Sequence, residues 1–446
     1  MHPSTRIHLV LACAVYLGAL HISYIYLTAP YFGYYGLGYS PTSTAAVVLS
    51  MVAALLPVLW LPINTNRPSL VVYYLIYTFV IVPACIVPAY TGALATAELI
   101  RLQVWVLLCF GLLSLVYLVP LSQLPRIAIP KMWFFILLSV FSFATYATIV
   151  HYLGFSFRFP NPANVYEIRD GFNVQTEQIN STWLAYCMNW QAFVINPFFM
   201  AYGLLTKKYH WLVLGLVGEL AIYALGGLKQ VLFALALVLA LYAIEKHKNL
   251  GLSILWYMTT FVAMCFISDV FIFHTISGIT SMFVRRLIFM PGELTSFYYD
   301  FFSNNSFALL GLSILKGFVS YPYSLPPPKL IGAAYFAHDV TDANANYLAD
   351  GFANFGVAGM LGATVLLAAL LWVIDSISTT RSKALVILLL GLPAIEIANS
   401  GILTCIANHG VGLAVLLLYL LPREFDRIGQ RSARRTTLKL VPEPTY

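Results

Sequence analysis

Residues 277–305 read SGITSMFVRRLIFMPGELTSFYYDFFSNN, and residues 320–356 read SYPYSLPPPKLIGAAYFAHDVTDANANYLADGFANFG. These two pieces form the longest interval of the chain without a convincing membrane span. Their polar residues stand among aromatics and prolines, whereas the flanking segments are almost pure Leu, Val, Ala and Ile. This contrast predicts a membrane scaffold that holds a polar segment at a membrane surface. The function of the protein then depends on that polar segment.

The composition is that of a membrane protein. Hydrophobic residues make up 60% of the 446 residues and charged residues only 9%, far from the proportions of soluble domains. The apolar runs are about 20 residues long, which fits helices that cross a hydrocarbon core. The sequence therefore predicts an all-α polytopic membrane protein, with residues 1–446 forming one integral membrane domain.

The apolar runs define about twelve expected transmembrane helices. They are 7–28, 45–62, 69–90, 100–120, 132–152, 183–205, 210–226, 230–245, 250–274, 353–375, 384–400 and 401–421. The first run lacks a small-residue cleavage site, so it is interpreted as a retained helix rather than a signal peptide. Two large external loops are expected at 153–182 and 277–352, and a basic cytoplasmic tail at 422–446.

The basic residues give the expected orientation. With the N-terminus in the cytoplasm, sixteen of the 24 Lys and Arg residues fall in internal segments, as the positive-inside rule requires. They are Arg6, Arg67, Arg126, Lys131, Lys207, Lys208, Lys246, Lys248, Arg381, Lys383, Arg423, Arg427, Arg431, Arg434, Arg435 and Lys439. This distribution explains the net charge of +7 without nucleic acid as a partner. Both termini are therefore expected in the cytoplasm.

The other eight basic residues are expected at or beyond the outer surface. They are Arg101, Arg158, Arg169, Lys229, Arg285, Arg286, Lys316 and Lys329. Lys316 and Lys329 are interpreted as plain loop charges. Lys229 stands in the tight turn between two short spans, so it is expected below the surface, either in a site or paired structurally with Glu219. Glu396 and His409, in the last two spans, are expected to line the same cavity, although a buried His is more often a plain core residue.

The segment from Pro291 predicts an amphipathic helix at the membrane interface. Proline in the first turn and Glu293 beside it are typical of a helix start. Leu294, Phe297, Tyr298 and Phe301 then recur at helical spacing. Most of these rings are interpreted as packing rather than as a sugar platform. The SYPYSLPPPKL segment predicts a rigid polyproline-like connector.

Several kinds of chemistry lack their motifs in this sequence. There is no Walker motif, dinucleotide-binding glycine pattern, HExxH or paired-cysteine spacing, so no cofactor, metal site or disulfide framework is expected. Arginine binds phosphate with two parallel hydrogen bonds and keeps its charge, so a diphosphate is the natural ligand of an outer basic cluster. A diphosphate embedded at the membrane surface indicates a polyprenyl-diphosphate carrier.

Three patterns resemble bacterial O-antigen and oligosaccharide repeat-unit polymerases (Wzy-type). They are VYEIRDGF around Arg169, RRLIFMPGELTSFYYDFF from Arg285 and NANYLADGFANFGVAG from Asn344. The resemblance covers roughly residues 160–365. It does not extend to the spacing of an Arg followed eleven positions later by Gly: Arg158 is followed at that distance by Arg169, and Arg286 by Phe297.

The resemblance implies a GT-C-like helical glycosyltransferase of lipopolysaccharide biosynthesis in the bacterial inner membrane. Such an enzyme joins oligosaccharide repeat units carried on polyprenyl diphosphate, and a chain-length regulator is a further implied partner besides membrane lipid. The expected catalytic residues are Arg169, Lys229 and Arg286, which would stabilise the diphosphate leaving group, together with Glu293, Asp300 and Asp350. These three acids and His338 are candidates for the base or for holding the acceptor sugar. The expected substrate-binding residues are Arg158, Arg285, His338, Asn344, Asn346 and His409, with the two asparagines alternatively capping the helix that follows.

Two alternatives remain open. An O-antigen ligase-like glycosyltransferase would use the same donor with another acceptor. A flippase or transporter for lipid-linked oligosaccharides would also need an outer basic cavity, together with inverted repeats and broken helices. The polar residues inside the spans crowd the outer half, with Glu219 the main exception, which favours the polymerase.

Overall fold

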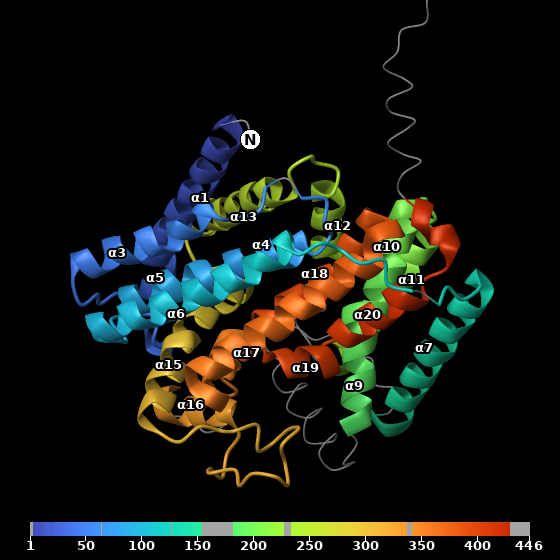
Figure 1. Cartoon of the computed structure of the whole chain (residues 1–446). Coiled ribbons are helices and arrows are strands. Elements are labelled where there is room, and N and C mark those ends of the chain that lie inside the picture. The colour runs from blue at the N-terminus through green and yellow to red at the C-terminus, as the bar shows by residue number, and fades with distance from the viewer. Residues whose placement is uncertain are drawn as a thin grey trace, which may run out of the picture.

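The structure is a computed structural model that describes residues 3–63, 65–125, 127–153, 182–226, 233–336 and 341–428. The described chain is helical throughout, and no strand occurs in these ranges. The helices of the first third are α1 (Pro3–Ser23), α2 (Ala29–Phe32), α3 (Thr44–Leu55), α4 (Leu70–Ile76), α5 (Val82–Thr91), α6 (Thr96–Ser114) and α7 (Lys131–Leu153). Figure 1 shows α1 and α3 to α6 at the left and centre of the molecule, whereas α7 lies at its right edge.

The remaining helices complete the bundle. They are α9 (Thr182–Trp190), α10 (Asn196–Thr206), α11 (Tyr209–Gly226), α12 (Ala234–Ile244), α13 (Leu250–Ile267), α14 (Gly278–Thr280), α15 (Met290–Asn304), α16 (Pro327–Phe336), α17 (Tyr347–Ile377), α18 (Lys383–Ile397), α19 (Ile402–Ala407) and α20 (Val411–Leu420). The 320–330 segment is thus only partly an extended connector, because α16 begins within its prolines.

Six described helical stretches are long and apolar enough to cross a membrane. They are Thr5–Tyr35, Leu70–Thr91, Thr96–Leu118, Lys131–Tyr152, Leu250–Phe273 and Tyr347–Thr380. Four shorter apolar helices accompany them, at Thr44–Leu59, Tyr209–Ala224, Ala234–Ile244 and Val411–Leu420. The chain is therefore an all-helical protein with several candidate membrane spans.

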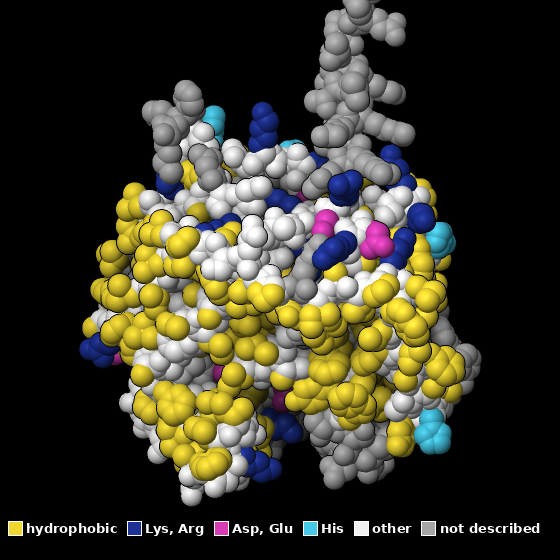
Figure 2. Space-filling view, turned by 45° about the vertical axis from the view of Figure 1, so that its right-hand side comes forward, with side chains coloured by type: hydrophobic (Ala, Val, Ile, Leu, Met, Phe, Trp, Pro, Cys, Tyr) yellow, Lys and Arg dark blue, Asp and Glu magenta, His cyan; other side chains and the backbone are white. Residues whose placement is uncertain are grey.

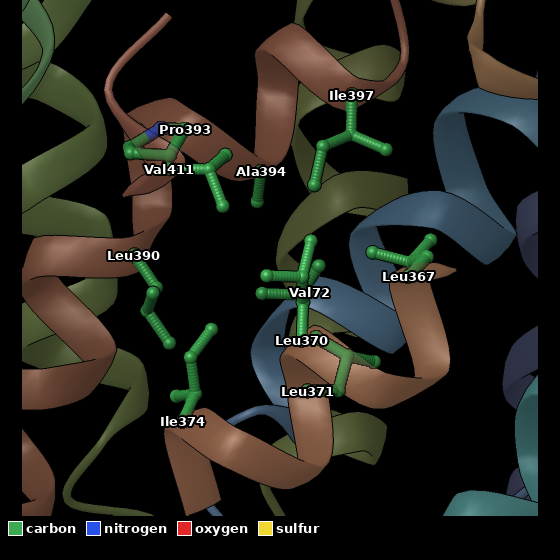
Figure 3. Close-up of a pocket in the computed structure, with 10 residues that line it drawn as sticks. All are labelled: Val72, Leu367, Leu370, Leu371, Ile374, Leu390, Pro393, Ala394, Ile397 and Val411. Carbon is green, nitrogen blue, oxygen red and sulfur yellow. The ribbon is translucent and has the colours of Figure 1, made fainter. Parts of the chain in front are cut away.

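The centre of the bundle is the continuous stretch formed by α4, the π-helical turn Tyr77–Ile81 and α5. Every residue in the most apolar part of Leu70–Thr91 is buried inside the protein. A helix that is apolar on all faces is stable where other helices enclose it, and α3, α6, α13, α15 and α18 do so here. The void shown in Figure 3, between α4, α17, α18 and α20, is apolar and about 10 Å³, so it reflects packing and has no room for a ligand.

The helix expected at the membrane interface lies inside the protein instead. α15 does begin at the predicted place, with Pro291 in its first turn. Its residues from Pro291 to Tyr299 are all buried, because the helix packs between α5 and α17. Phe297 stacks on Tyr335 with 4.3 Å between ring centroids, so this ring serves packing, as expected.

One long helix of the structure is broken. Inside α17, Phe355 has φ −146° and Gly356 has φ +58°, a left-handed value that favours glycine. Asn354, just before the break, is fixed by another segment of the chain, because its Oδ1 accepts from the Leu310 backbone N–H at 2.8 Å. The first two turns, from Tyr347, are therefore a separate half-helix set against the longer second part.

Several of the described basic residues that were expected inside the cell lie at one end of the bundle. Arg6 donates to the Val58 carbonyl at 2.7 Å, and Lys383 donates to Asn66 at 2.8 Å. Figure 2 shows dark blue side chains gathered on the corresponding upper face, above sides covered largely by hydrophobic residues.

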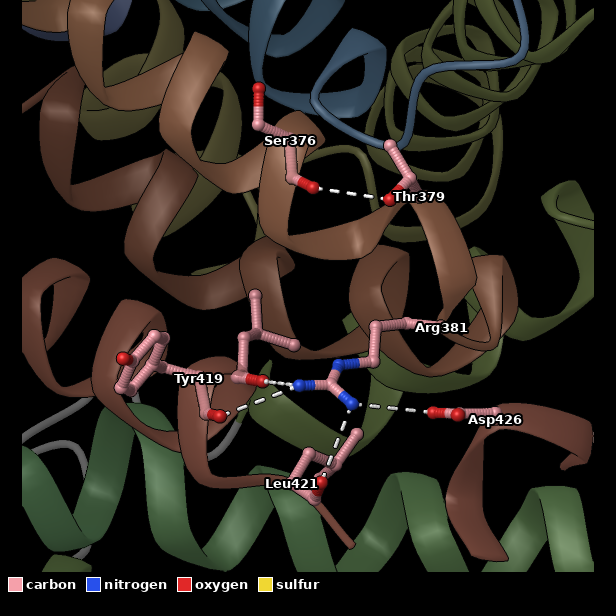
Figure 4. A network of polar contacts seen from close by, with 7 residues as sticks. Ser376, Thr379, Arg381, Tyr419, Leu421 and Asp426 are labelled. Carbon is pink, nitrogen blue, oxygen red and sulfur yellow. Dashed lines mark hydrogen bonds and ion pairs between the residues drawn. The ribbon is translucent and has the colours of Figure 1, made fainter. Parts of the chain in front are cut away.

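Arg381 joins three segments at this basic end. Its guanidinium donates to the carbonyls of Leu418 (2.7 Å), Tyr419 (3.4 Å) and Leu421 (3.4 Å), at the C-terminal end of α20, and pairs with Asp426 at 3.3 Å (Figure 4). The Arg381 side chain is completely buried. It therefore satisfies helix-end carbonyls that have no partner within the helix.

Candidate functional site

A group of charged and titratable side chains converges from four segments of the chain, and we call it the polar cluster. Its members are Arg286, Asp350, Glu396 and His409. They come from the π-helical segment Ser281–Phe289, the half-helix of α17, the end of α18 and the break between α19 and α20. Irregular backbone at membrane depth is tolerated where it lines a cavity or is buried in protein, so this convergence indicates a site.

The two neighbouring arginines of the π-helical segment point to different surroundings. Arg285 stacks over the rings of Phe32 and Tyr35, at 4.6 Å and 5.0 Å from their centroids. Arg286 is exposed, and its charge acts on the Glu396 carboxylate. The structure thus places Arg286 in the polar cluster and turns Arg285 towards aromatic packing, although both were expected to bind the substrate.

Glu396 and His409 form the inner part of the cluster. His409 Nδ1 lies 3.5 Å from Glu396 Oε2, a distance at which the two pair when His409 is protonated but which exceeds a good hydrogen bond. Glu396 is buried and His409 nearly so. The structure thus brings Glu396 and His409 into contact, whereas the expected cavity shared with Lys229 includes a residue outside the described ranges.

The last expected span, 401–421, is not one continuous helix. It is divided into α19 and α20 at Asn408, His409 and Gly410, and Gly410 has φ +85°. Asn189 of α9 donates to Asn408 Oδ1 at 3.0 Å and holds the break in place. This break brings the His409 ring back towards Glu396.

Asp350 reaches the cluster from the half-helix of α17. A Cβ at Gly401 would lie 2.3 Å from Asp350 Oδ2, so only glycine allows the carboxylate this approach. Both Asp350 and Glu396 act electrostatically on Cys405, which places both acids near this residue of α19. Two carboxyl groups and a histidine therefore surround one short stretch of chain.

The asparagines before α17 have different roles. Asn346 is buried and caps the helix, because its Oδ1 accepts from the backbone N–H groups of Leu348 (3.0 Å) and Ala349 (3.2 Å). Its amide also donates to Thr295 Oγ1 at 2.8 Å, which ties α17 to α15. The capping alternative is thus correct for Asn346, whereas Asn344 is exposed.

The acids of α15 lie elsewhere. Glu293 is buried against α5, where Thr91 Oγ1 donates to its carboxylate at 3.0 Å, and burial raises the pKa of Glu293 to about 8 although this hydrogen bond lowers it. Asp300 accepts a hydrogen bond of 2.6 Å from the Tyr335 hydroxyl. Neither contact joins these expected base candidates to the polar cluster.

Four expected site residues lie outside the described residues. They are Arg158, Arg169, Lys229 and His338. Arg101, which was also expected at the outer surface, forms an ion pair of 2.8 Å with Glu98 one turn away, and this pair explains its charge.

Glu396 had no assigned chemical role in the sequence-based site. The available signal was an acid inside an otherwise apolar span, which marks functional positions in membrane proteins. Sequence spacing does not show that Glu396 and Asp350 flank the same helix, because 46 positions and a broken helix separate them.

The cluster lies away from the basic end, because α19 stands in the lower half of the view in Figure 1. Figure 2 shows dark blue and magenta side chains close together on the lower face as well. A cation beside two carboxyl groups and an imidazole can hold an anionic group and exchange a proton with a neighbouring hydroxyl. No family model matches this chain, and neither a curated protein nor a solved structure is significantly similar to it.

Proposed function

We propose that this chain is a membrane glycosyltransferase that polymerises polysaccharide from oligosaccharide repeat units carried on polyprenyl diphosphate. The observation that carries the proposal is the closeness of Arg286 and Glu396, with His409 and Asp350 alongside, in a membrane protein. The sequence resemblance to repeat-unit polymerases supports the substrate class. The proposal places the protein in the bacterial inner membrane.

The proposed arrangement has twelve spans, with both termini in the cytoplasm and residues 153–182 and 277–352 outside. The gathering of Arg6, Lys383 and Arg381 at one end supports this orientation, because basic residues remain in the cytoplasm. The polar cluster then belongs to the outer half, where lipid-linked repeat units are joined.

In the proposed reaction a sugar hydroxyl of one repeat unit attacks the anomeric carbon of the glycan on the carrier. The new glycosidic C–O bond forms while the bond from the anomeric carbon to the diphosphate oxygen breaks, and the electron pair leaves with the diphosphate. Arg286 stabilises the charge that develops there. The hydroxyl proton passes to one of the two cluster carboxylates, Asp350 or Glu396.

Replacing Arg286 with lysine tests this assignment. Lysine keeps the charge but loses the two-pronged contact, so we expect polymerisation to slow on the order of a hundredfold, the equivalent of losing charge-assisted hydrogen bonds. The measurement is the glycan chain length formed by the purified, reconstituted variant from lipid-linked repeat units. Arg285→Lys is the matched control. Arg285 packs on aromatic rings, so this variant should keep most of the activity.

Wild-type chain lengths from Arg286→Lys would show that the residue does not hold the diphosphate. The variants Asp350→Asn and Glu396→Gln then separate the two acids. The proton acceptor is the one whose amide abolishes turnover while binding of the lipid-linked unit persists. If both amide variants polymerise normally, the proposed reaction at this cluster is wrong.

Transport of lipid-linked oligosaccharide is the second candidate. The breaks at Phe355–Gly356 and Asn408–Gly410 favour it, since interrupted helices form the substrate sites of many transporters. Vesicles containing the purified chain and labelled lipid-linked units distinguish the two. Movement of the label across the bilayer without chain growth would replace the polymerase by a transporter.

A further inference from the structure

A second polar region lies in the bundle where α7, α10 and α11 pack, and it is separate from the polar cluster. It surrounds a cavity of about 390 Å³. The polar lining comes from Ser139, Ser142, Tyr146, Gln191 and Asn196, and the rest of the wall is apolar. Ser139, Ser142 and Tyr146 lie in the middle of α7. Gln191 and Asn196 lie in the middle of the continuous helical stretch formed by α9, the π-helical turn Gln191–Ile195 and α10. Polar groups in such a position are costly unless they hold something.

The amides of this region are held in fixed positions. Gln191 Nε2 donates to Asn196 Oδ1 at 2.7 Å and to Ser142 Oγ at 3.1 Å. The Tyr146 hydroxyl also donates to Asn196 Oδ1, at 3.3 Å. Gln191 and Asn196 are almost completely buried, at 1% and 2% exposure. The network is therefore preorganised within the protein.

Glu219 of α11 is buried directly beside this network, with 2% of its surface exposed. It interacts with Asn196 and Tyr146, which both line the cavity. Neither carboxylate oxygen is placed for a hydrogen bond, however, and the same is true of Gln191 Oε1. Among the described ranges, no basic side chain forms an ion pair with Glu219.

The unpartnered atoms leave this region with an excess of acceptors. Three oxygens, two from Glu219 and one from Gln191, have no hydrogen-bond partner, against a single donor nitrogen on Asn196. Buried acceptors need donors or a positive charge. One carboxylate among neutral oxygens is neutralised by one positive charge, whereas a divalent ion would leave an uncompensated charge in the bilayer.

We propose that the Glu219 carboxylate and Gln191 Oε1, beside Asn196, form a binding site for a monovalent hard cation, Na⁺. Carboxylate and amide carbonyl oxygens are the ligands such cations prefer. The adjoining pocket is open and large enough for water, and its polar lining gives the ion an entry path along an otherwise apolar wall. The site is independent of the polymerase proposal, because it shares no residue with the polar cluster.

The test is a sodium titration of the purified full-length chain in detergent. Chloride and ionic strength are kept constant with choline chloride, and KCl serves as a second arm. Binding to the folded state raises the unfolding temperature, so we expect a rise of several °C with NaCl that saturates, and a smaller response to KCl. Glu219→Gln should unfold without a sodium-dependent rise, and Gln191→Leu should need about tenfold more sodium.

Asp375→Asn is the control. Asp375 is also a buried acid, but its carboxylate accepts a hydrogen bond from Ser69 Oγ at 2.7 Å, so this variant should keep the sodium response. Gel filtration confirms that each variant is folded. If Glu219→Gln does not fold, Gln191→Leu alone decides the outcome. A wild-type protein that is stabilised by acid but not by sodium would show that Glu219 holds a proton instead, and the proposal would be wrong. An unchanged sodium response in both variants would also overturn it.

Discussion

Arg381 and Arg286 are both arginines near acids in one helical bundle, yet their surroundings differ. The Arg381 side chain is completely buried, donates to three carbonyls and pairs with Asp426. Arg286 is exposed beside Glu396, close to breaks in the helices. The comparison shows how a structural arginine differs from a candidate ligand-binding arginine. Arg381 donates to carbonyls at the end of a helix, and Arg286 keeps its charge exposed.

The largest effect should come from Arg381→Met. It removes the donors from buried carbonyls at the end of α20, so we expect the free energy of unfolding to fall by about 3–5 kcal/mol. Thermal unfolding of the purified chain measures it. Arg423→Ala, an exposed position nearby, is the control and should change little. Equal stability of the two variants would mean that Arg381 does not stabilise the end of α20.

An intermediate effect is expected from Gly401→Ala in the polar cluster. The added Cβ would lie 2.3 Å from Asp350 Oδ2, so the carboxylate must move, at a cost of about 1–3 kcal/mol in stability. Polymerisation should fall by about tenfold or more, because misplacing a catalytic group by about 1 Å is costly. Chain-length analysis and thermal unfolding check the two parts.

Gly362→Ala is the matched control for this prediction. A Cβ at Gly362 meets no atom within 4 Å, and alanine favours the helix. We therefore expect unchanged activity and equal or slightly higher stability. Full activity in Gly401→Ala would remove Asp350 from the proposed reaction.

The smallest effect on polymerisation is expected from Glu293→Gln, because the contacts of Glu293 do not join it to the polar cluster. Burial raises the pKa of Glu293 to about 8, so the folded protein holds a proton that the unfolded chain loses near pH 4.5. Between these values the folded state binds more protons, and stability therefore falls as pH rises from about 4.5 to about 8. In Glu293→Gln, the part of the pH-dependent loss of stability that comes from Glu293 should be absent.

Unfolding temperatures measured from pH 5 to pH 9 test the Glu293 prediction. Glu424→Gln, which alters an exposed acid, should follow the wild-type curve. If Glu293→Gln also follows that curve, the carboxyl group is charged in the folded protein. Glu293 would then resemble the polar cluster more than the structural acids.

The sequence by itself determined the class of fold and the place of most helices. Apolar runs near 20 residues cannot satisfy their backbone in a bilayer except as helices, so composition and length suffice for that inference. The closeness of Glu396 and His409 also followed from sequence, because a short connection joins their segments. The same holds for the start of α15, which Pro291 and Glu293 indicate locally.

Only the tertiary structure decided which polar residues share a site. The break at Gly356 and the break at Gly410 depend on contacts with Leu310 and Asn189, which come from distant parts of the chain. Other long-range contacts place Arg286 near Glu396, Arg285 on aromatic rings and Glu293 against α5. Periodicity along one helix shows which of its faces are apolar, but not which neighbouring segment each face packs against. That neighbouring segment decides which polar residues share a site.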